Sequence, residues 1–273
     1  MEERRMILFS DLDGTLLNND KSISHGNQKA IEKMLEAGHY LVIATGRPVA
    51  SARKAVKNLG LVMPGCYMIA FNGAIVYGCD SNHIFLEKTM SIEYVEYLFE
   101  EAKKYNLHIQ TYSRSHVIAQ KDSKELEFYT KNTKMSYKIA ENVFDELQKE
   151  PNKVLLISLT DNEKLKQFQK DHEKWAQGKC NSFFSCDEYL EYCPKDTSKG
   201  AAIRFIAEFL NIPIKDTIAI GDELNDISML QMAGRGIAMK NAKPEVKAIA
   251  DYVTKGDNEQ DAIAEIIERF INV

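Results

Sequence analysis

The sequence of 273 residues has little of what marks secreted, zinc-binding or membrane-spanning chains. Its five cysteines are odd in number and form no CxxC pair, which argues against a cysteine-based zinc site and against a full disulfide framework. No apolar run is long enough for a membrane span or for the core of a signal peptide. Free thiols in a reducing compartment are the simpler interpretation, so we expect a cytoplasmic protein without a membrane partner.

Charge and composition narrow the class further. The formal net charge is -5, and no basic block is long enough to follow a nucleic-acid backbone, so we expect no nucleic-acid partner. The chain contains no repeat of solenoid period and no low-complexity linker. Hydrophobic residues make up 44% and charged residues 27%, which is ordinary for a globular enzyme. At this length two modules are expected.

Three segments share one pattern, in which a short apolar run leads into a polar or glycine-containing turn and then into a helical period. The runs are residues 6–9, 41–44 and 217–220. Continuous apolar runs are typical of strands that are buried on both faces of a parallel sheet. Gly38 suits the end of the first helix, and Pro48 suits the first position of the next. The pattern predicts an α/β fold with a doubly wound, mostly parallel sheet.

The middle of the chain has a different pattern, which predicts an inserted α+β module. Short strand-like runs alternate there with helical periods. We therefore divide the chain into a core, residues 1–82 and 194–273, and an inserted cap, residues 83–193. An insert of roughly 110 residues is large enough to be an independent unit.

The segment DLDGT at residues 11–15 follows the first predicted strand, where open α/β sheets place their ligands. Its two carboxylates can converge on one metal, because a divalent cation would offset their repulsion. A plain turn or a helix cap is the alternative for this segment alone. A calcium loop is excluded, because Leu16 stands where such a loop needs glycine and Ser22 where it needs glutamate.

Three other groups stand at comparable places. Residues 221–226, with the sequence GDELND, follow the strand at 217–220, residues 45–47 follow the strand at 41–44, and Lys199 begins a helical period. Each has an ordinary alternative: a capped helix start, a turn with a surface arginine, or a solvated lysine. Their joint arrangement brings carboxylates, a hydroxyl with free backbone amides, and a lysine to the same edge of one sheet.

The order DxDGT, TGR, KG and GDxxND resembles the haloacid dehalogenase superfamily of phosphatases, over essentially the whole chain. The long insert resembles the type IIB cap of its Cof-like subgroup. Asn72-Gly73 matches a segment that is common in this subgroup near the hinge into the cap. One departure is that Asp196 and Thr197 stand where the subgroup often has a glycine and an aliphatic residue, which affects the local loop more than the chemistry.

This resemblance implies a Mg²⁺-dependent phosphatase that hydrolyses small phosphomonoesters, either sugar phosphates or phosphorylated cofactors, through an aspartyl-phosphate intermediate. By resemblance, Asp11 is the nucleophile, Asp13 is the general acid and base, and Lys199 steadies the nucleophile and the phosphoryl group. The phosphate-binding residues that it implies are Leu12, Thr45, Gly46, Arg47, Lys199 and Asn225. The metal ligands that it implies are Asp11, Asp13, Asp222 and Asp226.

Elementary chemistry agrees with these roles. A carboxylate attacks a phosphate ester only if cations offset the repulsion between two anions, which Mg²⁺ and Lys199 would provide. Oxygen ligands without a Cys/His cluster favour magnesium over zinc. A free aspartic acid titrates at about 3.9. Because Asp13 must donate a proton to the leaving group, we expect the site to raise its pKa.

Two alternatives to a phosphatase stay open. A phosphosugar mutase uses the same aspartyl-phosphate and also occurs with this cap type, and a regulatory protein on the same scaffold would need no catalysis. The second is disfavoured because the predicted nucleophile, acid, lysine and metal ligands are all present. The oligomeric state has no signal in the sequence. In the cap, the candidates for contact with the leaving group are Tyr112, Arg114, His116 and Tyr189.

Overall fold

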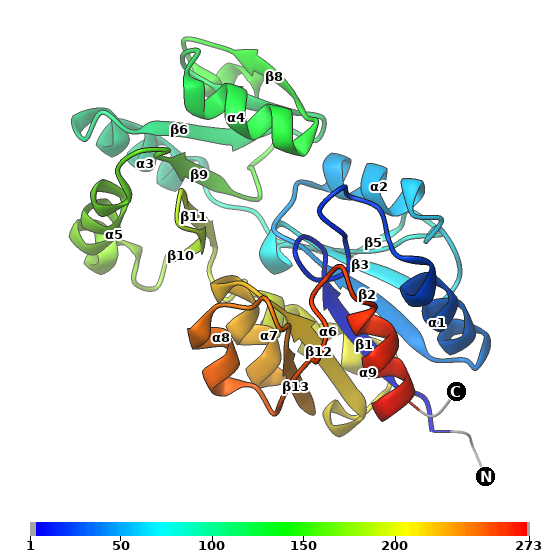
Figure 1. Cartoon of the computed structure of the whole chain (residues 1–273). Helices are drawn as coiled ribbons and strands as arrows, with labels where there is room; N and C mark the ends of the chain where they lie inside the picture. Colours follow the sequence, from blue (N-terminus) through cyan, green and yellow to red (C-terminus); the bar gives the residue numbers. More distant parts are fainter. Residues whose placement is uncertain (1–3, 272–273) are drawn as a thin grey trace.

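The computed structural model describes residues 4–271, so the outermost residues of the predicted core, 1–3 and 272–273, lie outside the described part. Within residues 4–271 the strands form one eight-stranded and one six-stranded sheet. The smaller sheet and its helices lie above the larger sheet in Figure 1. The predicted α/β fold class is confirmed, and we keep the names core and cap for the parts built on the larger and the smaller sheet.

The strands of the core are β1 (Ile7–Asp11), β2 (Tyr40–Ala44), β3 (Cys66–Ala70), β4 (Ile75–Gly78), β5 (Ile84–Glu87), β12 (Thr217–Gly221), β13 (Arg235–Ala238) and β14 (Tyr252–Val253). They run in the order β14-β13-β12-β1-β2-β3-β4-β5. Neighbouring strands are parallel from β14 to β3 and antiparallel from β3 to β5. Strand β1 is buried along its whole length between β2 and β12, as its continuous apolar run predicts.

The helices of the core are α1 (His25–Glu36), α2 (Val49–Asn58), α6 (Lys199–Phe209), α7 (Ile227–Met232), α8 (Pro244–Ile249) and α9 (Ala262–Phe270), with short 3-10 turns η1 (Phe71–Gly73), η3 (Ile214–Asp216) and η4 (Leu224–Asp226). Helix α1 packs against α9, and α6 against α7. Gly38 follows α1 with φ +83°, as predicted for a helix end. Pro48 is the N-cap of α2 with extended backbone, so the prediction that it takes the first helical position was wrong by one residue.

The cap contains strands β6 (His108–Tyr112), β7 (His116–Ala119), β8 (Ser136–Ile139), β9 (Val154–Ile157), β10 (Cys180–Cys186) and β11 (Tyr189–Pro194), helices α3 (Ile92–Lys104), α4 (Lys124–Thr133) and α5 (Asn162–Ala176), and a 3-10 turn η2 (Val143–Glu146). Its strand order is β10-β11-β9-β6-β7-β8, and among the described strands of the cap only β7 and β8 pair in parallel. Leu98 and Phe168 of α3 and α5 pack with Ile109 and Leu156 on one face of this sheet. Tyr112, from the opposite face, contacts Phe71 of the core at 5.3 Å between ring centroids.

The chain passes between the two sheets at two places. Strand β5 pairs with β4, so the chain leaves the core sheet after Glu87, a few residues beyond the predicted boundary at residue 83. It leaves the cap sheet at Pro194, beside the predicted boundary at 193. Both connections lie near the carboxyl end of the core sheet, which positions the cap over that edge (Figure 1).

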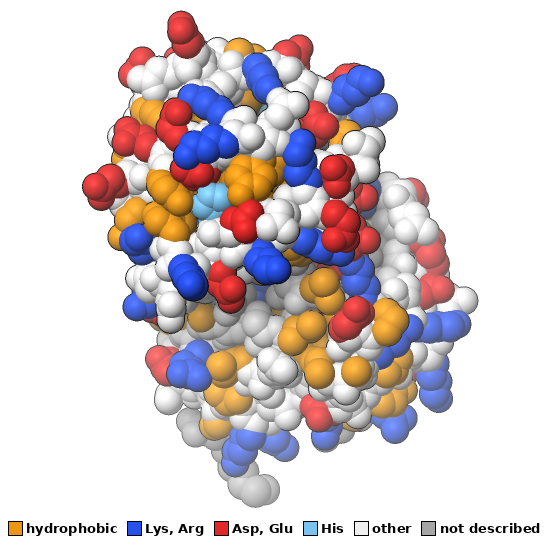
Figure 2. All heavy atoms as spheres, turned by 90° about the vertical axis from the view of Figure 1, so that its left-hand side faces the viewer, with side chains coloured by type: hydrophobic (Ala, Val, Ile, Leu, Met, Phe, Trp, Pro, Cys, Tyr) orange, Lys and Arg blue, Asp and Glu red, His pale blue; other side chains and the backbone are white. Residues whose placement is uncertain are grey.

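The surface carries charges of both signs. On the face shown in Figure 2, Lys and Arg side chains lie among Asp and Glu side chains over both parts of the molecule. None of the helices in the described part of the chain combines the length and the apolar content that a membrane crossing requires.

Candidate active site

The predicted motifs meet at the carboxyl end of the core sheet. Asp11 is the last residue of β1, which pairs in parallel with β2 on one side and β12 on the other. The register aligns Asp11 with Ala44, so Thr45 follows at the next position of the neighbouring strand. Asp222 comes directly after β12. Three separate stretches of sequence therefore deliver polar groups to one edge, as the strand pattern predicted.

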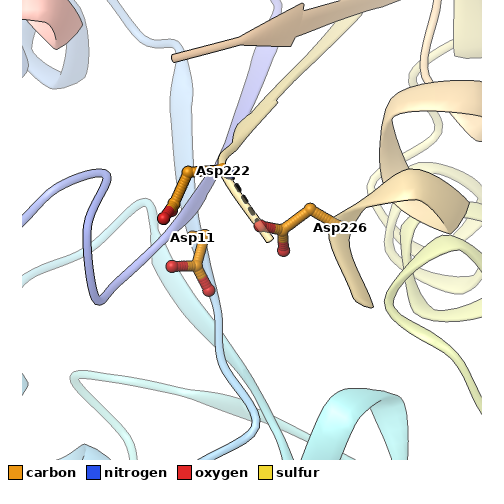
Figure 3. A group of neighbouring side chains, drawn as sticks. All are labelled: Asp11, Asp222 and Asp226. Carbon is orange, nitrogen blue, oxygen red and sulfur yellow. Dashed lines mark hydrogen bonds between the residues drawn. The ribbon is translucent and has the colours of Figure 1, made fainter. Parts of the chain in front are cut away.

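Three carboxylates converge there. Asp11, Asp222 and Asp226 each offer one oxygen, and these atoms all lie within 4.8 Å of one another (Figure 3). The backbone N–H groups of Asp222 and Glu223 donate to Asp226 Oδ2 at 2.9 Å. Asp226 thereby fixes the turn that presents Asp222.

Asp222 is held from the other side by the first motif. Thr15 Oγ1 donates to Asp222 Oδ1 at 2.6 Å. Gly14 has φ +82°, and a Cβ added to it would lie 2.4 Å from Asp222 Oδ2. Only glycine fits this close approach, which explains the glycine of the DxDGT segment.

Lys199 is buried between two of these carboxylates at the start of α6. Its Nζ donates to Asp11 Oδ1 and to Asp226 Oδ1, each at 2.5 Å. Burial by itself would lower the pKa of Lys199, but Asp11 and Asp226 outweigh it and raise that pKa above its ordinary value. The lysine therefore carries a positive charge against the nucleophile that was predicted from sequence.

One lysine does not balance the negative charge of the site. Burial, together with the charge of Asp226, raises the pKa of Asp11 to about 7, although Lys199 lowers it. Burial and the charges of Asp11 and Asp226 raise the pKa of Asp222 to about 8. Crowded carboxylates that resist ionisation are the environment that a divalent cation relieves, and oxygen donors of this kind fit Mg²⁺. The predicted metal thus fits the residues present.

Asp13 lies in different surroundings from these three carboxylates. Arg47 donates to it twice, from Nε to Oδ2 at 2.6 Å and from Nη2 to Oδ1 at 2.5 Å, and Lys21 Nζ lies 2.9 Å from Oδ1. Burial would raise the pKa of Asp13, but Arg47 and Lys21 outweigh it and hold that pKa below its ordinary value. The expectation of a raised pKa was therefore wrong for the protein without substrate. The Asp13 carboxylate faces Arg47 and Lys21. Its role as a metal ligand stays a prediction.

The predicted phosphate-binding residues surround the same edge. Thr45 Oγ1 accepts from the backbone N–H of Arg47 at 3.1 Å, which leaves the hydroxyl proton available to a phosphate oxygen. Asn225 Nδ2 donates to Asn72 Oδ1 at 3.0 Å. The side chain of Leu12 is fully buried in the hydrophobic core, so any contact of this residue with phosphate falls to its backbone.

A pocket of about 530 Å³ opens over these groups, and residues of the cap line its far side. Of the four cap residues that were predicted to contact a leaving group, only Tyr189 lines it. Tyr112 and Arg114 line a separate pocket of about 240 Å³, and His116 Nδ1 lies 3.1 Å from Ser113 Oγ. The cap residues that do line the site are Tyr129, Asn132, Thr133, Lys153, Ser185, Cys186, Tyr189 and Glu191.

Sequence reasoning missed most of these cap residues, and it also missed Lys21. Lys21 carried a weak signal, because it follows the DxDGT segment within a few residues and could return to it through a turn. Lys153 and Glu191 could not be recognised as site residues from the sequence. Each is a charged residue within or next to an apolar strand run. Such a residue is either at a strand end or buried with a partner, and pattern alone does not say which.

Comparison with known proteins agrees with the geometry. The family described as haloacid dehalogenase-like hydrolase matches residues 8–267. The 5-amino-6-(5-phospho-D-ribitylamino)uracil phosphatase YitU of Bacillus subtilis (strain 168) is 27% identical over 289 residues, covering 100% of both chains. A solved haloacid dehalogenase-like hydrolase from Bacteroides thetaiotaomicron is 30% identical with a TM-score of 0.87, covering 97% of this chain and 99% of that one.

The fold has a second solved counterpart. A haloacid dehalogenase subclass IIB sugar phosphatase shares the fold with a TM-score of 0.78 at 24% identity, over 97% of this chain and 98% of that one. The matched family range spans both sheets and all four motifs. The resemblance predicted from sequence is confirmed: the chain belongs to the haloacid dehalogenase-like hydrolases and is a phosphatase of the phosphoric monoester hydrolase class.

Proposed function

We propose that this protein is a Mg²⁺-dependent phosphatase that passes the phosphoryl group of a small phosphomonoester first to Asp11 and then to water. The observation that carries the proposal is the setting of Asp11. Its carboxylate stands at a strand end, is contacted by the buried Lys199 at 2.5 Å, and lies in a group of carboxylates within 4.8 Å of one another. This setting offsets anionic charge and fixes one nucleophile in place, which is what phosphoryl transfer asks of a protein.

In the first step a carboxylate oxygen of Asp11 forms a bond to phosphorus while the bond from phosphorus to the ester oxygen breaks. Asp13 gives its proton to the departing alkoxide. Arg47 and Lys21 hold Asp13 ionised before substrate arrives, so for Asp13 to act as an acid both cations must turn toward the substrate and the carboxylate must take up a proton from water. A bound phosphate ester supplies the negative charge that would draw them.

In the second step water attacks the aspartyl-phosphate, and the bond between phosphorus and the oxygen of Asp11 breaks. Asp13, now ionised, takes the proton of the attacking water. Lys199, Thr45 and the backbone around Gly46 would neutralise and hold the phosphoryl oxygens, with Asn225 beside them. Asp11, Asp222 and Asp226 would hold Mg²⁺, with Asp13 as the further predicted ligand; when bound, the ion supplies positive charge to the phosphoryl oxygens.

The leaving group would lie against the cap. The pocket of about 530 Å³ is of the size that holds a small metabolite, and its cap side carries phenol, amide and hydroxyl groups of Tyr129, Asn132 and Thr133. We therefore propose sugar phosphates or phosphorylated cofactors as substrates, with chemistry in the core and specificity in the cap. The cytoplasmic location and the absence of a nucleic-acid partner stay predictions from sequence.

The test is a phosphate-release assay over a panel of small phosphate esters with Mg²⁺, run on the wild-type protein and on Asp11→Asn. We expect release of free phosphate from at least one sugar phosphate or cofactor phosphate, and none from Asp11→Asn. A mutase would instead convert a sugar phosphate into its isomer with little free phosphate. A regulatory protein would release phosphate from no ester, and that result would contradict the proposal.

A further inference from the structure

A buried ion pair on the underside of the cap reaches the phosphate-binding loops of the core. Lys153 stands directly before β9, and Glu191 lies in β11, which pairs with β9 so that Glu191 is opposite Leu155. Lys153 Nζ and Glu191 Oε2 are 2.9 Å apart, and both side chains are almost fully buried, with 2% and 3% of their surface exposed. Burial would lower the pKa of Lys153, but Glu191 and Tyr129 outweigh it and raise that pKa, so the lysine is held as a cation.

Both members of the pair also bond to the core. Lys153 Nζ donates to the backbone carbonyl of Gly46 at 3.0 Å, inside the loop that joins Thr45 to Arg47. Glu191 Oε2 accepts from Asn72 Nδ2 at 2.8 Å. Through Asn72 Oδ1, which accepts from Asn225 Nδ2 at 3.0 Å, this second contact continues to another predicted phosphate-binding residue.

Asn72-Gly73, the segment that resembles the hinge region of the Cof-like subgroup, is the centre of this connection. Asn72 has φ 54°, and its backbone N–H donates to the carbonyl of Thr45 at 3.1 Å. A Cβ on Gly73 would lie 2.2 Å from the carbonyl oxygen of Ser198, the residue before Lys199. The Asn-Gly turn is therefore pressed between the loop at residues 45–47 and the start of α6.

A contribution to folding stability does not by itself explain why this ion pair is buried here. A buried ion pair loses much of its Coulombic gain to desolvation, and apolar residues of similar volume often serve a core as well. Here both charged residues belong to the cap, yet their further hydrogen bonds go to the core at Gly46 and Asn72. The Lys153 ammonium also lies over the rings of Phe71 and Tyr112, at 5.7 and 5.3 Å from their centroids, and Phe71 belongs to the core.

We propose that Lys153 and Glu191 are positioning residues for phosphoryl transfer, which fix the loop at residues 45–47 and the Asn72–Asn225 amide chain when the cap is seated on the core. The inference rests on the proposed function, since it assigns these two residues a part in the same site. Its consequence is that the core completes its phosphate site only in contact with this cap. Neither residue touches the reacting atoms in this role; both act through Gly46, Asn72 and Asn225.

The test compares three proteins with the wild type in steady-state kinetics with para-nitrophenyl phosphate and Mg²⁺. The double variant Lys153→Met/Glu191→Leu removes both charges, so neither is left unpaired. Asn72→Gly keeps the ion pair and the positive φ but breaks the connection to Asn225. The control is Lys138→Met/Glu146→Leu, which removes a more exposed ion pair of the same cap, with 51% and 27% of the side chains exposed.

Misplacing reacting groups by about 1 Å costs about 100-fold in rate, so we expect the double variant to lose kcat/KM by about that factor. We expect Asn72→Gly to lose about 10-fold, inorganic phosphate to inhibit both variants more weakly than the wild type, and the control to stay within about twofold. A folded double variant or an Asn72→Gly protein with wild-type kcat/KM would overturn the proposal. So would a loss confined to a sugar phosphate with para-nitrophenyl phosphate unaffected, because the pair would then act on the leaving group.

Hydrogen exchange separates this inference from the proposed function. If the double variant does not fold, Asn72→Gly decides the kinetic question. If the wild type hydrolyses no ester, the proposed function fails, and the amide hydrogens of residues 45–47 still report on positioning. We expect them to exchange faster in the double variant than in the control, because that variant loses the hydrogen bond from Lys153 to the carbonyl of Gly46, and equal rates would overturn the coupling between the cap and this loop.

Discussion

Replacing Asp11 with asparagine should stabilise the metal-free protein at alkaline pH while abolishing turnover. Burial and the neighbouring Asp226 raise the pKa of Asp11 from 3.8 to about 7, with Lys199 opposing them. A carboxyl with a raised folded-state pKa contributes stability that is complete below its unfolded pKa and is lost as pH rises through the folded pKa. Above pH 7 the wild type therefore bears the full cost of ionising Asp11, and the neutral amide of the variant bears none.

The magnitude follows from the pKa. One pKa unit corresponds to about 1.4 kcal/mol, so a rise from 3.8 to about 7 costs the folded state on the order of 4 kcal/mol above pH 7. Near pH 5 the carboxyl is still mostly protonated in the folded state, and the gain from the variant should be about half as large or less. Lys199 keeps its contact with Asp226 in the variant, so no buried charge is left unpaired.

The assay is urea unfolding in EDTA at about pH 5 and about pH 8.5, for the wild type, Asp11→Asn and a control, Asp187→Asn. Asp187 is 72% exposed, so its substitution should change the free energy of unfolding little at either pH. Adding Mg²⁺ should stabilise the wild type more than Asp11→Asn, because the ion replaces the missing positive charge. An Asp11→Asn protein that is less stable than the wild type in EDTA at the higher pH would refute this reasoning.

Three further predictions concern activity. Asp13→Asn should slow the hydrolysis of a sugar phosphate more than that of para-nitrophenyl phosphate, because an aryl oxide leaves without protonation; equal losses would show that Asp13 is not the acid. Turnover should require Mg²⁺ or Mn²⁺, with Ca²⁺ a poor substitute, since Ca²⁺ takes more ligands at longer distances; full activity after dialysis against EDTA would contradict this. Exchanging the cap for that of a relative with another preference should change the ranking of substrates but not the metal requirement, and a folded chimera that keeps the original ranking would contradict the division of labour.

The core sheet could be predicted from sequence because its central strands are buried on both faces. Residues 7–11, 40–44 and 217–221 are almost entirely buried, and their continuous apolar runs indicate this burial in the sequence. Strand β8 has no such apolar run in its sequence. All four residues of Ser136–Ile139 are exposed, and the strand exists because it pairs with β7, which is a tertiary fact that no local pattern contains.

The active site, like the fold, could be predicted from the sequence only in part. The core motifs could be read because each lies at the end of an apolar strand run or at a helix start, and parallel strands bring such ends together. The direction of the pKa shift of Asp13 could not be read, because it depends on Arg47 and Lys21 reaching one carboxylate from different loops. Tyr112 was a reasonable candidate on a cap strand, but its ring turns to Phe71 and the interior.

The central claim is that the phosphoryl group passes through Asp11, and it can be tested by trapping. With para-nitrophenyl phosphate, Asp13→Asn should form the aspartyl-phosphate readily and break it down slowly, because only the second step then needs the missing base. Acid quenching, proteolysis and mass spectrometry should find one phosphoryl group on Asp11, and none when Asp11→Asn is combined with it. Turnover without any phosphorylated protein, or a phosphoryl group on another residue, would contradict the account.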